Sequence, residues 1–303
     1  MLRLLLLASA PCAASSPPPL RAAARRLPPR LLQHRIAMSA DAGATRPLGT
    51  NGTPEASPKR AKVSADDGDE HGLNFEPLGD ALLVDTEALE WRSSGPAAKV
   101  ERKRVFRNGP PESGRVTSMV RYRPNAAFPR HPHPQGEEIF VLEGLFKDER
   151  GDHGPGTWLL NPEGFEHEPS TDEGGNLIFV RLRQYPGFER RQLALDTNAM
   201  AWDPNGRKVL AAQPEFVDTQ YLERFRGAPP ARLAPAGGLE LFVVSGSFES
   251  NHGVHGTHSW CRLRAGVPLE PRALPDGEEA ILLVKENGEP SWLPPLEAAG
   301  GDH

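Results

Sequence analysis

The sequence has little cysteine and no long apolar run near its start. Its two cysteines are Cys12 and Cys261, and Cys12 lies in a segment that looks like a leader. A mature chain without that segment has one thiol and therefore no internal disulfide, which fits a reducing compartment or a fold that needs no disulfide. The leucine run at residues 4–7 is far shorter than the roughly 20 residues that span a bilayer. We expect no membrane partner.

Basic residues are also too few for a nucleic-acid-binding protein. The 303 residues carry a formal net charge of -5, whereas a surface that binds nucleic acid is normally basic. Only 38% of the residues are hydrophobic, and 32 are prolines. A packed core then requires that part of the chain is tail, and we expect no nucleic-acid partner.

The first forty residues contain no Asp or Glu but several arginines. This composition is typical of an organelle transit peptide. We interpret residues 1–72 as a transit-like leader followed by a disordered linker, and we expect a mitochondrial protein, with a plastid as the alternative. A secretory signal competes, since Ala8, Ser9 and Ala10 follow the leucine run. Translation from Met38 would instead leave the protein in the cytoplasm or nucleus.

The remaining chain repeats itself. When residues 130–180 are shifted by 102 positions without gaps, fifteen of 51 positions are identical, against roughly three or four expected from average residue usage. The pairs include Glu138 with Glu240 and Trp158 with Trp260. We predict two domains, at residues 73–187 and 188–296.

Short apolar runs and alternating stretches, separated by turn residues every 8 to 12 positions, indicate β-structure in both copies. Residues 138–142 and 239–244 are apolar runs that end at glycines, and residues 116–122 alternate. We see no long helical pattern. The predicted fold class is all-β, with two jelly-roll β-barrels in tandem after the leader.

Three histidines and one glutamate follow the spacing of a metal site. His131 and His133 are two residues apart, so in a strand both imidazoles point to the same side. Glu137 follows after a turn, and His167 comes thirty residues later. This donor set suits Fe(II), Mn(II), Zn(II), Ni(II) or Cu(II). Together with nearby glycines and a proline, the four candidates form two longer motifs. The first consists of His131, His133, Glu137 and Gly144, and the second of Gly156, Pro162, Gly164 and His167.

These two motifs are the cupin motifs, and residues 83–185 resemble the ChrR-like cupin family. The resemblance lies in residues 128–133, 137–144, 146–151 and 167–170, and it implies a jelly-roll domain that binds a divalent metal through His131, His133, Glu137 and His167. We favour Fe(II) or Zn(II) as the bound ion over Mn(II) or Ni(II). Thr171 replaces the usual Asn, and the zinc-binding helical domain of anti-sigma members is missing, so an anti-sigma role is not expected.

The second copy has lost its ligands. In the ungapped alignment their positions hold Leu233, Pro235, Leu239 and Leu269, and we expect the three leucines to be core residues of a domain that supports the first. His252, His255 and His258 are spaced by three, which matches neither face of a strand. We interpret them as solvated turn residues.

Two functions remain open. The resemblance to diketone- and aryl-ketone-cleaving cupins implies a metal-dependent dioxygenase that acts on a small chelating molecule. The alternative is a non-catalytic zinc-binding sensor or binding module. No catalytic residue beyond the ligands and no cofactor beyond the metal is identified. Arg121, Tyr122, Phe140, Trp158 and Gln184 are candidates for the pocket lining, and a homodimer is compatible with the sequence.

Overall fold

The computed structural model describes residues 80–288, except for 95–96, 109–113, 273 and 275–278. The predicted leader and linker at residues 1–72 lie outside the described residues. Within them, helix is limited to two single 3-10 turns, η1 (Thr86–Ala88) and η2 (Thr197–Ala199). Asp85 and Asp196 cap these turns, and each accepts a hydrogen bond from the backbone two residues ahead. No described helix is long and apolar enough to cross a membrane. The predicted all-β class is confirmed.

Seven antiparallel strands form the first large sheet, in the order β12-β9-β6-β11-β4-β3-β2. Two small hairpin-like sheets, β5 with β10 and β7 with β8, accompany it. The strands are β2 (Arg92–Ser94), β3 (Ala97–Asn108), β4 (Arg115–Tyr122), β5 (His131–His133), β6 (Glu137–Gly144), β7 (Phe146–Asp148), β8 (Gly151–His153), β9 (Thr157–Asn161), β10 (Phe165–His167), β11 (Asn176–Leu182) and β12 (Leu193–Asp196).

Six antiparallel strands form the second large sheet, in the order β1-β19-β16-β22-β14-β13, with two small sheets beside it. In both halves the sheets stay separate, so neither half is a barrel closed by one continuous ladder. The strands are β1 (Ala81–Val84), β13 (Arg207–Ala211), β14 (Thr219–Arg226), β15 (Arg232–Leu233), β16 (Leu239–Ser245), β17 (Phe248–Ser250), β18 (Gly253–His255), β19 (Trp260–Leu263), β20 (Pro268–Leu269), β21 (Pro271–Arg272) and β22 (Glu279–Glu286).

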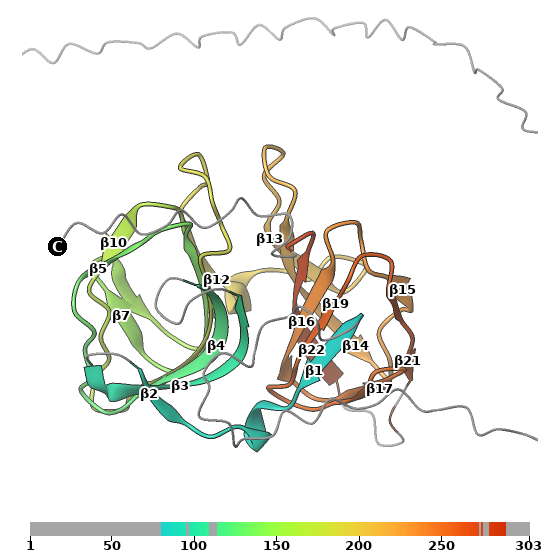
Figure 1. The fold of residues 1–303 in the computed structure, drawn as a ribbon, viewed down its shortest axis with the longest axis horizontal. Helices are drawn as coiled ribbons and strands as arrows, with labels where there is room; N and C mark the ends of the chain where they lie inside the picture. Colours follow the sequence, from blue (N-terminus) through green and yellow to red (C-terminus); the bar gives the residue numbers. More distant parts are fainter. Residues whose placement is uncertain (1–79, 95–96, 109–113, 273, 275–278, 289–303) are drawn as a thin grey trace, which may run out of the picture. The chain divides into compact units, whose positions relative to one another are not determined.

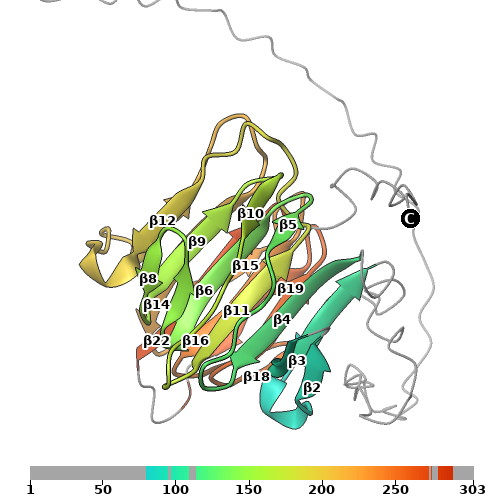
Figure 2. The same cartoon turned by 90° about the vertical axis from the view of Figure 1, so that its left-hand side faces the viewer.

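The two halves exchange edge strands. β1 precedes the first large sheet in the chain, yet it pairs with β19 of the second sheet. In Figure 1 it lies, in cyan, among the strands labelled β16, β19 and β22. β12 follows the first sheet in the chain and pairs with β9 at its edge, as Figure 2 shows. Strands from each predicted domain therefore complete the sheet of the other.

Alternation along the strands gives the first large sheet two buried faces. On β6, Ile139 and Val141 belong to a core inside the first half, whereas Phe140 belongs to a core shared by both large sheets. In the shared core, Phe179 stacks on Phe242 with ring centroids 4.1 Å apart. The other, inner face of the first sheet therefore packs inside the first half, on the side of the metal motifs.

The two sheets carry matching contacts at positions related by the repeat. Trp158 donates a hydrogen bond to Glu138 in the first sheet, and Trp260 donates one to Glu240 in the second. In each half a tryptophan near the 3-10 turn also lies against a lysine and an arginine. The contacts are Trp91 with Lys103 and Arg121, and Trp202 with Lys208 and Arg224.

The prediction that Leu233 is a core residue of the second half is wrong. Leu239 and Leu269 are buried, but the side chain of Leu233 is 68% exposed. The reason is a register difference: Arg232, not Leu233, lies opposite Leu269, in the place where His131 lies opposite His167. The ungapped alignment is therefore displaced by one residue at this strand.

Candidate metal centre

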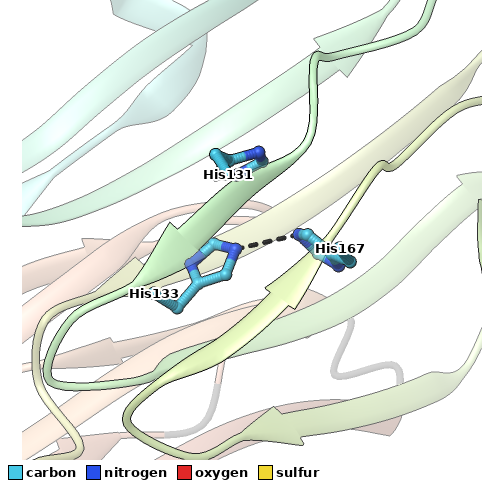
Figure 3. A group of neighbouring side chains, drawn as sticks. All are labelled: His131, His133 and His167. Carbon is cyan, nitrogen blue, oxygen red and sulfur yellow. Dashed lines mark hydrogen bonds between the residues drawn. The ribbon is translucent and has the colours of Figure 1, made fainter.

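The two short strands β5 and β10 bring the three histidines together. They pair antiparallel, with His131 opposite His167 and His133 opposite Phe165. The Nε2 atoms of His133 and His167 are 2.9 Å apart, and one ring nitrogen from each of the three histidines lies within 4.8 Å of the others (Figure 3). Three imidazoles that converge in this way can hold a transition-metal ion.

A tight turn places Glu137 beside the histidines. Gln135 and Gly136 both have positive φ, 55° and 72°, and the N–H of Gly136 bonds to the carbonyl of His133 at 3.1 Å. A Cβ at position 136 would lie 2.7 Å from a backbone oxygen of Tyr185, so glycine is required there. Glu137 Oε2 then lies 3.5 Å from Nε2 of His133 and 3.6 Å from Nε2 of His167.

Burial shifts the pKa values of three of the candidate ligands. It lowers the pKa of His133 to about 2, and it also lowers the pKa of His131. These two imidazoles are therefore neutral at pH 7, the form in which a histidine binds a metal. Burial raises the pKa of Glu137, although His167 and a hydrogen bond from Asn161 act in the opposite direction. A bound cation would favour the ionised carboxylate.

Polar side chains outside the ligand set fix two of the ligands. Asn161 Nδ2 donates a hydrogen bond of 2.9 Å to Glu137 Oε2. Asp148 Oδ2 lies 3.7 Å from Nδ1 of His167, which leaves Nε2 of that ring directed at the other histidines. Burial raises the pKa of Asp148, but hydrogen bonds from His153 and Arg150, together with the nearby ring of His167, outweigh it and hold the pKa well below its usual range. A carboxylate that contacts the far nitrogen of a ligating histidine fixes the ring and makes it a stronger donor.

A cavity of about 170 Å³ borders the cluster. The three histidines and Glu137 form one wall, and apolar side chains of β4 and β11 form much of the rest, among them Val120 and Val180. An ion held by the cluster would therefore be reachable by a small molecule.

Of the five suggested lining residues, Tyr122 lines this cavity. Phe140 and Trp158 belong to the shared core on the opposite face of the sheet. Arg121 pairs with Glu101, and Gln184 is held by Val116 and Thr117.

Sequence reasoning did not find Asp148 or Asn161, nor the arginines that line the cavity. The resemblance included the turn at residues 146–151 but gave no role to the aspartate within it. The interpretation of the second-copy histidines is wrong for His255, which is fully buried with Nε2 2.7 Å from Ser250 Oγ. Within the described part of the chain, His131, His133 and His167 are the one group of three potential ligands found close enough for a metal.

Comparison with known proteins agrees with this architecture. Residues 80–186, about a third of the chain, match the ChrR cupin-like domain. No curated protein matches the sequence.

Several solved structures share the fold. They include a candidate dioxygenase from Nostoc punctiforme (TM-score 0.55, 16% identity, 69% of this chain and 83% of that chain). The nickel(II) complex of the bacterial pirin YhhW from Escherichia coli gives a TM-score of 0.53 at 14% identity, over 69% of this chain and 99% of that one. The protein Ylba from E. coli gives 0.54 at 14%, over 69% and 91%. Identities this low show the fold alone. The described chain has the cupin fold, and its residues 80–186 match the ChrR cupin-like domain.

Proposed function

We propose that this protein is a metal-dependent enzyme of the dioxygenase type that acts on a small chelating substrate, such as a diketone or an aryl ketone. The observation that supports the proposal is the cavity of about 170 Å³ against the imidazoles and Glu137. Structural metal sites are closed by protein ligands, whereas catalytic sites keep a position open for water or substrate. A cavity at the cluster favours the second kind.

The size of the cavity narrows the choice of substrate. An engineered cavity of about 150 Å³ in another protein holds benzene, so about 170 Å³ suits a molecule of six to eight heavy atoms. A short diketone such as 2,4-pentanedione meets this limit. An aryl ketone, which adds a chain to the ring, fills the space or exceeds it.

The lining favours oxidation over acid–base chemistry. Among the described residues that line the cavity, no carboxylate or imidazole stands apart from the proposed ligands. Burial raises the pKa of Tyr122 above its usual range, so its phenol is no base at neutral pH. An isomerase or lyase would need such a base.

Each group near the cluster has a role in this proposal. His131, His133, Glu137 and His167 would hold the ion, and Asp148 and Asn161 would orient two of these ligands. The apolar lining would exclude bulk water from the substrate. A divalent ion bound there would supply Lewis-acid polarisation and, if it is iron, redox chemistry with oxygen.

The test starts with the metal. Protein purified without oxygen is analysed for its metal and loaded with Fe(II), and oxygen uptake is measured with 2,4-pentanedione and then with an aryl ketone. We expect uptake that depends on the ion and is lost in His133→Ala but kept in His252→Ala, which changes a histidine outside the cluster. Tightly retained zinc without oxygen uptake would support the alternative, a non-catalytic zinc-binding module of the same family, since the donor set also suits zinc.

We also propose that the protein works in the mitochondrion, because its first forty residues contain arginine but no acidic residue. A fluorescent reporter fused to residues 1–72 tests this. A diffuse cytosolic or nuclear signal would instead favour translation from Met38.

A further inference from the structure

Three arginines line the same cavity as the candidate metal ligands: Arg102, Arg104 and Arg183. Arg102 and Arg104 belong to β3, and Arg183 directly follows the end of β11. Arg102 and Arg104 lie two residues apart on β3, so both point to the inner face. They pair with Val120 and Ser118 of β4, which line the cavity too.

Arg183 reaches the cavity through its backbone conformation. It follows Leu182, which also lines the cavity, and successive residues of a regular strand point to opposite faces. Arg183 has a φ of 59°, in the left-handed region that residues other than glycine seldom adopt. Its N–H bonds to the carbonyl of Gly136 at 2.9 Å, which ties it to the turn before Glu137. Unusual backbone conformations of this kind are concentrated at functional sites.

The arginines and the four candidate ligands line one and the same cavity. Apolar side chains such as Ile178 and Val180 line this cavity too, and a low-dielectric surrounding strengthens the attraction between charges.

We propose that the cavity binds its substrate as an anion, a small enolate or 2-oxo carboxylate whose oxygen atoms lie between the metal position and Arg102, Arg104 and Arg183. The inference rests on the proposed function and specifies the charge of the substrate. Guanidinium groups recognise such oxygens through paired, charge-assisted hydrogen bonds. Neutral ketones that do not enolise would lack this attraction.

Matched small molecules test the inference. Pyruvate and 2,3-butanedione have nearly the same shape, but only pyruvate is charged, and 2,4-pentanedione represents the enolate. Binding of each is measured by calorimetry without oxygen, in the metal-free and in the metal-loaded protein. We expect pyruvate, 2,4-pentanedione or both to bind at least about tenfold more tightly than 2,3-butanedione, because a hydrogen bond to a charged group contributes that much. Whichever of the two is preferred distinguishes a carboxylate from an enolate.

The variants Arg102→Gln and Arg183→Gln should each reduce this preference about tenfold while the metal content stays unchanged. Lys99→Gln is the control, because it removes the same charge from an exposed position on β3. Equal binding of all three molecules to the wild type, or an unchanged preference in both arginine variants, would overturn the inference. If metal analysis shows that the protein binds no metal, the proposed function is wrong. The binding measurement on the metal-free protein still decides whether the cavity prefers anions.

Discussion

Arg181 of the first large sheet donates a hydrogen bond of 2.5 Å to Glu240 of the second. The same guanidinium also bonds to Glu138 of its own sheet at 2.6 Å. All three side chains are buried. One cation thus joins two carboxylates at related positions of the repeat, and it ties the two large sheets together inside their shared core.

Removing that cation should destabilise the whole folded region. Arg181→Met leaves Glu138 without its cation, although Glu240 keeps its ion pair with Arg262, and breaking a buried ion pair costs about 3–5 kcal/mol. Urea denaturation measures the loss. Arg226→Met, at an exposed arginine of the second sheet, should change stability by less than about 1 kcal/mol. Equal midpoints for the two variants would show that Arg181 does not stabilise the fold.

The filled interior of the second half should not accept a charge. Leu239 is buried at the position related to Glu137, so Leu239→Asp places an unpaired carboxylate in an apolar core. We expect a loss of several kcal/mol, comparable with the stability of a domain. Leu233→Asp is the matched change at an exposed leucine and should cost about 0.5 kcal/mol or less. Thermal unfolding compares the two variants. An unfolding temperature of Leu239→Asp equal to that of the wild type would mean that this half has room for a polar group.

The protein should bind one divalent ion per chain. The first half gathers three histidines and a glutamate, whereas leucines occupy the positions of Glu137 and His167 in the second half. Elemental analysis should therefore give about one equivalent. The double variant His131→Ala, His133→Ala should lose several of the roughly 10–16 kcal/mol typical of tight zinc sites. Two equivalents in the wild type, or full retention in the double variant, would contradict the assignment of the ligands.

Asp148 should matter for metal affinity although it is no ligand. Asp148→Asn weakens the contact with His167, and partners of this kind typically contribute about 10- to 100-fold to affinity. Competition with a chromogenic chelator measures the change. Asp152→Asn, an exposed aspartate of the same hairpin, should leave affinity unaltered. If both variants bind metal equally well, Asp148 has no positioning role.

The placement of His131, His133 and Glu137 could be anticipated because it depends on short-range rules, whereas His167 could be assigned only from the motif and the family resemblance. Alternation in a strand aligns His131 with His133, and a turn rich in positive φ returns the chain to Glu137. The same rule also separates Phe140 from the cavity: three positions from Glu137 is an odd number, so the ring faces the other sheet. That part of the lining prediction could have been corrected from the sequence.

Other features depend on contacts between distant segments, which spacing does not encode. Arg183 lines the cavity only because one residue leaves the regular strand conformation. Leu233 is exposed because its strand pairs one residue out of step with the first copy. Neither the irregular backbone at Arg183 nor the register shift at Leu233 can be detected in an ungapped comparison of two sequences.

The exchange of β1 and β12 has a consequence for how the chain acquires its structure during synthesis. β1 is among the first described strands to leave the ribosome, but its partner β19 follows about 180 residues later. Contacts so far apart in sequence raise the contact order and slow folding. The second large sheet therefore cannot be completed until β19 and β22 have been translated, whereas the first large sheet has all of its strands as soon as β12 has been made.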